Sequence, residues 1–83
     1  MQCLLIYDIS DDGARQRVAD CCLDYGLQRV QYSAFIGDLS TTHQRELFGA
    51  IRTRLRGKAA NVQLFPLDAA TWAKRRELKQ DNT

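Results

Sequence analysis

The apolar run from Cys3 to Tyr7, which ends on Asp8, constrains the fold of this chain most strongly. An uninterrupted apolar run of this length is typical of a strand that is buried on both faces at the centre of a sheet. Asp8 then stands at the carboxyl end of a rigid element, which is where ligands collect in open α/β sheets. Asp8 equally suits the beginning of a turn, together with Ser10 and Asp11. Both interpretations of this carboxylate stay open at this point.

The chain has 83 residues, which is enough for one small domain. A core of this size is marginal without disulfides, a metal or a partner subunit, and a homodimer would bury more surface. Cys3, Cys21 and Cys22 are odd in number and lack CxxC spacing, so we expect reduced, buried thiols in a cytoplasmic protein. We expect no signal peptide before the first strand and no segment that spans a membrane.

The charge of the chain permits nucleic-acid binding without requiring it. The net charge is only +2, but nine of the 12 basic residues are arginine. Arginine binds phosphate groups through its planar fork of donors, and it also forms ordinary surface ion pairs.

The first helix is predicted to follow Ser10, a good N-cap, with two acidic residues at the positive end of the helix dipole. Gly26 should end it. Apolar residues recur between these limits at helical spacing, namely Ala14, Val18, Cys21, Cys22 and Tyr25. Arg15 and Arg17 lie off this stripe, at the same end of the molecule as Asp8. Pairing of these arginines with acids on a solvated face is the alternative.

Residues 28–39 alternate, and we expect two strands there, with a hairpin near Ser33-Ala34 or near Gly37-Asp38; a single bent strand is the alternative. One strand face carries Arg29, Gln31, Ser33 and Phe35. An arginine and an aromatic residue on one face suit a partner subunit or a nucleic-acid strand. Ordinary half-buried packing of Phe35 is the competing account.

The second helix is predicted to open at Ser40–Thr42, with Thr41 and Gln44 at capping-box spacing, and to end at Gly57. Its arginines form a ridge away from the apolar stripe, at Arg45, Arg52, Arg54 and Arg56. Such a ridge either follows a phosphate backbone or is a solvated face.

The last strand is predicted over Asn61 to Leu67, with Pro66 on a sheet edge because it cannot donate a hydrogen bond. We place the domain at residues 1–67 and a C-terminal tail at residues 68–83. The tail is expected to form a short helix over Trp72 to Leu78, or to dock on a second subunit through Trp72.

The element order, strand-helix-strand-strand-helix-strand, predicts an α+β, ferredoxin-like fold. This βαββαβ plan gives a four-stranded antiparallel sheet with two helices on one face. The other face is left bare, which favours a homodimer or the binding of a nucleic-acid strand. The fold alone does not determine a function.

The chain resembles the CRISPR-associated Cas-two family in the segments 7–10, 25–35 and 37–40, together with Asp12, Arg15 and Arg17. The resemblance implies a small ferredoxin-like homodimer of the spacer-acquisition machinery with metal-dependent endonuclease activity. It makes Asp8 the metal ligand. It also implies a supporting cleft of Tyr7, Arg15, Arg17, Arg29, Ser33 and Phe35. After Leu67 the match fades, so the exchange of tails between subunits that the family shows is not expected with the same strength.

Mg²⁺ or Mn²⁺ requires several oxygen ligands, and one copy of this chain offers a single well-placed acid. An isologous two-fold interface presents each residue twice. Two copies of Asp8 would then share one metal ion, which activates water and neutralises the scissile phosphate. Arg15, Arg17 and Arg29 would position the nucleic-acid backbone.

The sequence therefore favours a metal-dependent phosphodiesterase that acts on RNA or duplex DNA. A non-catalytic alternative is a dimeric scaffold that holds duplex DNA on a basic surface and bridges two copies of the Cas-one integrase. A related toxin-type ribonuclease is a third hypothesis. An RNA-recognition module ranks last, because its aromatic-rich strand signature is missing.

Overall fold

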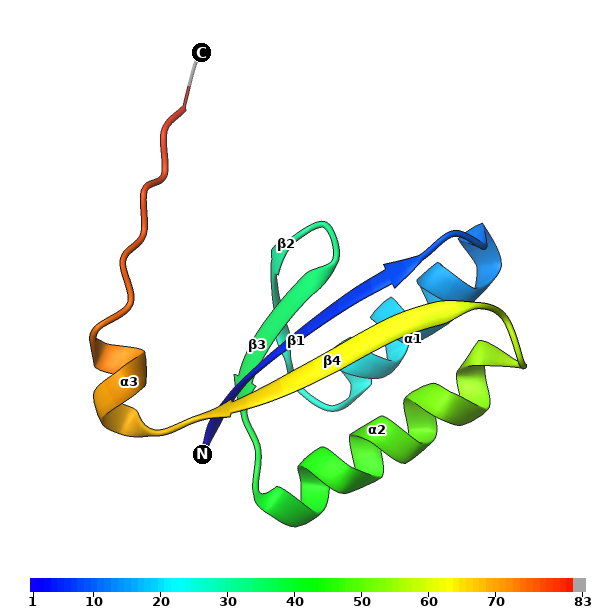
Figure 1. Cartoon of the computed structure of the whole chain (residues 1–83), viewed down its shortest axis with the longest axis horizontal. Coiled ribbons are helices and arrows are strands. Elements are labelled where there is room, and N and C mark those ends of the chain that lie inside the picture. Colours follow the sequence, from blue (N-terminus) through cyan, green and yellow to red (C-terminus); the bar gives the residue numbers. More distant parts are fainter. Residues whose placement is uncertain (82–83) are drawn as a thin grey trace.

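The computed structural model describes residues 1–81 and contains four strands and three helices. Their order along the chain is β1 (Gln2–Ile9), α1 (Asp12–Asp24), β2 (Gln28–Gln31), β3 (Ala34–Asp38), α2 (Thr41–Leu55), β4 (Ala60–Leu67) and α3 (Ala69–Ala73) (Figure 1). The predicted order is confirmed up to β4, and the residues between β2 and β3 form the expected hairpin.

The four strands form one sheet in the order β2-β3-β1-β4, and every neighbouring pair is antiparallel. This arrangement confirms the ferredoxin-like α+β fold. The apolar first strand is central, as predicted, because it pairs with both β3 and β4. β4 is an edge strand, and Pro66 within it pairs with Cys3. The edge position tolerates a residue without an N–H donor.

The sheet has one covered face and one open face. Side chains of β1 alternate, so that Cys3, Leu5, Tyr7 and Ile9 are buried in the core together with residues of α1 and α2. Phe35 of β3 is fully buried on the same side. Ordinary packing is therefore the correct account of this aromatic residue. Both long helices lie on the covered side, with α1 behind the strands in Figure 1.

α1 begins one residue later than Ser10 predicted. The side chain of Asp11 is the N-cap and accepts a hydrogen bond from the Ala14 N–H at 2.9 Å. The prediction of Ser10 was wrong because Asp11 offers the same short acceptor nearer to the free N–H groups. Gly26 does end the helix, with a φ of 82° that suits glycine, and the Leu27 N–H donates to the Cys22 carbonyl at 3.0 Å.

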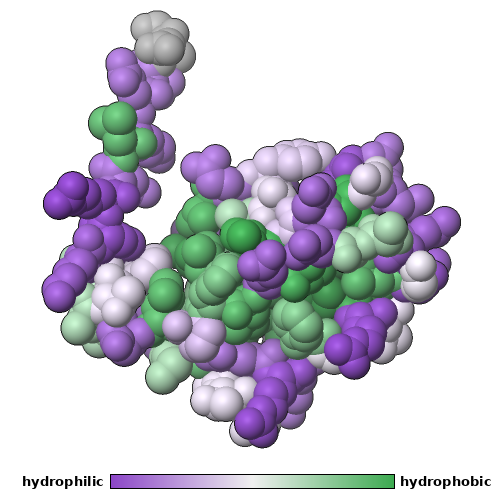
Figure 2. All heavy atoms as spheres, viewed as in Figure 1, coloured by the Kyte–Doolittle hydropathy of each residue, from purple (hydrophilic) through white to green (hydrophobic). Residues whose placement is uncertain are grey.

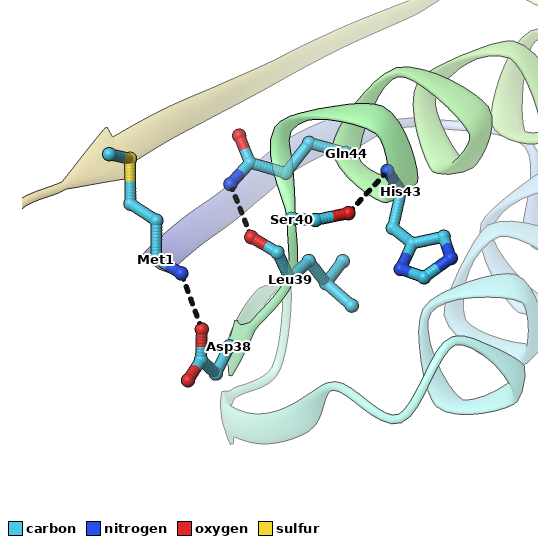
Figure 3. Close-up of polar contacts among 6 residues, drawn as sticks. All are labelled: Met1, Asp38, Leu39, Ser40, His43 and Gln44. Atoms are coloured by element: carbon cyan, nitrogen blue, oxygen red, sulfur yellow. Dashed lines mark hydrogen bonds and ion pairs between the residues drawn. The ribbon is translucent and has the colours of Figure 1, made fainter.

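The start of α2 is held by polar contacts that Figure 3 shows. The Ser40 hydroxyl accepts a hydrogen bond from the His43 N–H at 3.1 Å, so Ser40 and not Thr41 is the N-cap. Gln44 is buried and donates instead to the Leu39 carbonyl at 2.9 Å. Beside this turn, the terminal ammonium of Met1 binds the Asp38 carboxylate at 2.6 Å.

The tail differs from its prediction. The expected helix over Trp72 to Leu78 is wrong: α3 is shorter and begins at Ala69, because Asp68 caps it by accepting from the Thr71 N–H at 2.7 Å. Residues 75–81 have no regular secondary structure. The division of the chain into a domain at residues 1–67 and a tail at residues 68–83 stays a prediction. The last two residues of the tail, 82 and 83, lie outside the described part. None of the described helices has the length and apolar character needed to cross a membrane.

The three cysteines are free thiols and fully buried, as predicted. Burial raises the pKa of all three, and it raises the pKa of Cys22 to about 12. A thiolate is therefore strongly disfavoured in the core at neutral pH.

Candidate functional site

Asp8 lies near the end of β1 and is exposed on the open face of the sheet. Its cross-strand partner is Asn61, near the start of β4. Directly opposed residues of antiparallel strands have Cβ atoms about 4.5–5.5 Å apart, so the carboxylate and the amide are side by side. The Asn61 side-chain oxygen accepts a hydrogen bond from the Gln63 side chain at 3.2 Å.

The rest of the open face is largely apolar. Residues that share this face by register form what we call the open-face patch, consisting of Leu4, Ile6, Ala34, Ile36 and Phe65. Ile6 and Phe65 are 36% and 41% exposed, which is high for such large apolar side chains in a small domain. Figure 2 shows apolar side chains gathered over the strands on this side. Asp8 therefore lies at one end of an apolar surface.

Tyr7 and Phe35 lie on the opposite, covered face. Their rings stack with centroids 6.1 Å apart, and the Arg29 guanidinium lies 5.1 Å from the centroid of the Phe35 ring. The Tyr7 hydroxyl is buried and has no hydrogen-bond partner in the described part of the chain. Burial raises the pKa of Tyr7, and the nearby positive charge of Arg29 opposes this increase.

Arg15 lies beside the same aromatic group. Its guanidinium donates to the Ile9 carbonyl at 2.9 Å and pairs with Asp12. The guanidinium groups of Arg15 and Arg29 lie 5.8 and 6.0 Å from the centroid of the Tyr32 ring. These side chains enclose a pocket of about 180 Å³ on the covered side of the sheet.

Arg17 makes its contact elsewhere. Its Nε–H donates to the Arg54 carbonyl at 2.7 Å and so satisfies a carbonyl in the last turn of α2. Arg54 in turn pairs with Asp24 at 3.0 Å. The other arginines of the α2 ridge, Arg45, Arg52 and Arg56, are exposed to solvent. Arg17 therefore joins α1 to α2.

Ser33 lies in the turn between β2 and β3, and its carbonyl accepts a hydrogen bond from the Tyr7 N–H at 3.1 Å. This bond extends the pairing of β1 with the hairpin by one residue. Ser33 therefore acts through its backbone carbonyl, which fixes the position of the hairpin turn relative to Tyr7 and Asp8.

The seven predicted site residues therefore do not share one cleft in a single chain. The sheet separates Asp8 from Tyr7, Phe35 and the two arginines beside them. Sequence reasoning also missed two neighbours. The sequence predicts for Asn61 only the start of a strand, although its place opposite Asp8 follows once β4 pairs with β1. Strict alternation would place Tyr32 on the strand face opposite Arg29, but Tyr32 lies in the turn, and the Arg29 guanidinium is 6.0 Å from the centroid of its ring.

The described part of one chain does not provide a complete metal site. Among residues 1–81 there is no group of three or more histidine, cysteine, aspartate or glutamate residues that could hold a metal ion. Asp8 and Asn61 supply a carboxylate and an amide oxygen, both of which suit Mg²⁺, and more oxygen ligands are needed. A second copy of the same surface would supply them.

Comparison with known proteins gives consistent relatives. A CRISPR-associated endoribonuclease Cas2 2 from Chloroflexus aurantiacus is 69% identical over 80 residues, which cover 96% of this chain and 94% of that protein. A CRISPR-associated endonuclease Cas1/endonuclease Cas2 fusion from Thermoproteus tenax is 35% identical over 71 residues, which are 86% of this chain and 27% of the fusion.

Comparison with solved structures also finds a Cas2 protein. The crystal structure of Streptococcus pyogenes Cas2 at pH 6.5 superposes with a TM-score of 0.77 at 27% identity, covering 96% of this chain and 100% of that one. The family model described as CRISPR associated protein Cas2 matches residues 1–75, from the first strand through α3. The chain belongs to this CRISPR-associated Cas2 family.

Proposed function

We propose that this protein is a metal-dependent endonuclease of CRISPR adaptation, which hydrolyses phosphodiester bonds of RNA or duplex DNA as a homodimer. The observation that carries the proposal is the exposed Asp8 at the end of the open-face patch. Relatives that are named CRISPR-associated endoribonucleases support the activity.

The open-face patch supports the homodimer. A domain of this size buries little apolar surface alone, and packing two open faces together would remove Ile6 and Phe65 from water. In an isologous interface each residue occurs twice. Asp8 and Asn61 from both copies would then offer carboxylate and amide oxygens to one Mg²⁺ or Mn²⁺ ion.

Each site residue has a role in this proposal. The bound ion would activate water and stabilise charge on the scissile phosphate. Asp8 holds the ion, and Arg15 and Arg29 bind the phosphate backbone of the nucleic acid. The remaining residues position these groups: Tyr7, Ser33 and Phe35 fix the hairpin against β1, and Arg17 fixes α1 against α2.

The Asp8→Asn variant tests the activity, because it keeps the side-chain shape and removes the charge that binds the metal. Removal of outer-shell partners of a metal costs roughly 10–100-fold, so loss of the ligand itself should lower cleavage by about 100-fold or more. Labelled RNA and labelled duplex DNA would be incubated with Mg²⁺ or Mn²⁺. The matched control is Asp20→Asn, an exposed acid of α1 whose carboxylate accepts a hydrogen bond from the Gln16 side chain. Equal cleavage by the Asp8→Asn variant and wild type would overturn the proposal.

A second candidate function is a non-catalytic scaffold that holds duplex DNA and bridges copies of the Cas-one integrase. The observation that favours it is the Thermoproteus tenax relative, which is named as a Cas1/Cas2 fusion. The exposed arginines Arg45 and Arg52 of α2, with Arg56 at its C-cap, offer a basic surface for DNA. Spacer acquisition in cells that carry Asp8→Asn separates the two functions. A scaffold keeps its acquisition rate, whereas full loss in a folded, dimeric variant contradicts it.

A further inference from the structure

The strands of the sheet contain two carboxylates, and they differ in how their charge is balanced. By strand register Asp38, at the end of β3, shares the open face with Asp8 of β1. The terminal ammonium of Met1 binds the Asp38 carboxylate at 2.6 Å (Figure 3). The ion pairs of residues 1–81 join four other aspartates to cations, and Asp8 is in none of them. Asp8 is therefore an exposed charge without a counter-ion in the described part of its own chain.

The place of this charge opposes association of the open faces. Asp8 lies at the end of the open-face patch, and two-fold symmetry would bring two copies of it to one interface. Arg29 is the single cation of the strands, and it lies on the covered face beside the Phe35 ring. The strands therefore bring two negative charges and no positive charge to the closed interface. Like charges repel more strongly away from water, and a buried charge without a partner is costly.

We infer that a divalent cation controls dimerisation of this protein: the metal-free chains associate weakly, and Mg²⁺ or Mn²⁺ tightens the dimer by joining the two Asp8 carboxylates. The face-to-face dimer and the shared ion in this inference rest on the proposed function. One divalent cation balances the charge of two carboxylates, whereas a monovalent cation leaves an excess. Asn61, opposite Asp8 on β4, adds amide oxygens to the site without adding charge.

The coupling follows from the small number of ligands that one chain provides. Residues 1–81 contain no group of three or more metal-ligating side chains, so the ion should bind the dimer far better than the single chain. A ligand that binds the associated state alone stabilises this state by mass action. The coupling is reciprocal, so the affinity for the metal should also rise with protein concentration. Free metal would then set how many nuclease dimers are assembled.

Sedimentation equilibrium of the full chain, in EDTA and in rising Mg²⁺, measures the coupling. The dimer dissociation constant should fall about tenfold or more between EDTA and saturating Mg²⁺. Below saturation, the logarithm of the association constant should rise with the logarithm of free Mg²⁺ at a slope of about one, because one ion joins two chains. Sodium chloride of matched ionic strength controls for simple screening of the repulsion. Equal dissociation constants in EDTA and Mg²⁺, a slope of about two, or an equal effect of sodium chloride would overturn the inference.

The Asp8→Asn variant gives an outcome of opposite sign. It removes the repelling charges together with the metal ligand, so its dimer should be about tenfold tighter than that of the metal-free wild type, and equally tight in EDTA and Mg²⁺. Asp20→Asn, on the exposed side of α1, should keep the full metal response. The inference is wrong if the Asp8→Asn dimer still tightens with Mg²⁺, or if it is weaker than the metal-free wild type.

Asn61→Asp tests the same interface by adding charge. Two more carboxylates should weaken the metal-free dimer and enlarge its response to Mg²⁺, because each Asn61 lies opposite an Asp8. A metal-free dimer as tight as that of wild type would contradict the inference, since the added charges would then not meet. Cleavage is not measured in these experiments. A metal-linked dimer without nuclease activity would refute the proposed activity alone, and an active nuclease whose association ignores the metal would refute this inference alone.

Discussion

At the scale of single residues, burial decides the chemistry of the cysteines. Cys3, Cys21 and Cys22 are all fully buried in the core between the sheet and α1. Desolvation is the largest cause of the raised pKa of each thiol, because a buried thiolate has lost its hydration. These residues therefore act as small apolar groups, and their titration belongs to the stability of the fold.

The pH dependence of stability follows from Cys22. Its pKa rises from 9.0 to about 12 in the folded protein, so the folded state retains a proton that the unfolded state loses. The stability from the neutral thiol is fully present below pH 9 and is lost as the pH rises toward 12. Cys22→Ala should reduce this alkaline slope by about 1 kcal/mol per pH unit.

Urea unfolding at several values between pH 8 and pH 11 measures this slope. Leu23→Ala is the control, because Leu23 follows Cys22 in the chain and its side chain is exposed and does not titrate. Substituting Cys22 lowers stability at every pH, so the comparison concerns the slope alone. An identical slope in Cys22→Ala and wild type would contradict the assignment.

At the scale of elements, one glycine sets how closely β3 approaches the segment after α1. A Cβ atom at Gly37 would overlap the Leu27 side chain and would lie 3.3 Å from the Leu27 Cα. Leu27 is buried, so its side chain has little room to move aside. Gly37→Ala should therefore lower the free energy of unfolding by about 1–3 kcal/mol.

Gly49 offers a matched comparison within α2. A Cβ atom there has no neighbour within 4 Å, and the position is helical and exposed. Gly49→Ala should raise the free energy of unfolding by about 0.5–1 kcal/mol, because alanine is the better helix former. Denaturant unfolding of both variants measures the opposite signs. A neutral Gly37→Ala would show that the hairpin shifts to accept the methyl group.

The elements themselves could be predicted from local patterns, since apolar spacing and caps are contained in short stretches of sequence. α1, α2 and β4 followed from such patterns, whereas the position of α3 did not, because Asp68 caps a helix that begins at Ala69, three residues before the predicted start at Trp72. The strand alternation failed where the register shifts between Arg29 and Gln31, a hydrogen-bonding feature without a mark in the sequence. The contact of Arg17 was unpredictable for another reason: its acceptor is a backbone carbonyl 37 residues away.

At the scale of the whole molecule, the sheet divides the residues that the resemblance groups together. Tyr7 and Asp8 are adjacent in sequence, and strand geometry alone sends their side chains to opposite faces. This division could have been predicted, because β1 was recognised as a strand. Which face the helices cover could not, since Leu4 and Ile6 make the centre of the Asp8 face apolar as well. Only the packing of α1 and α2 leaves Asp8 and the open-face patch uncovered.

The open-face patch makes the assembly testable with one substitution. Ile6 lies between Ala34 and Gln63 at the middle of the sheet, so a charge there would be buried and unpaired in a face-to-face dimer. Ile6→Lys should weaken dimerisation about 30-fold or more, as loss of a central interface residue does. Sedimentation equilibrium measures the effect, with Leu23→Lys on the outer surface of α1 as the control that stays dimeric. The monomer should also lose metal-dependent cleavage, because each Asp8 then lacks its counterpart. A dimer of unchanged affinity would place the interface elsewhere and remove the basis for a shared metal ion.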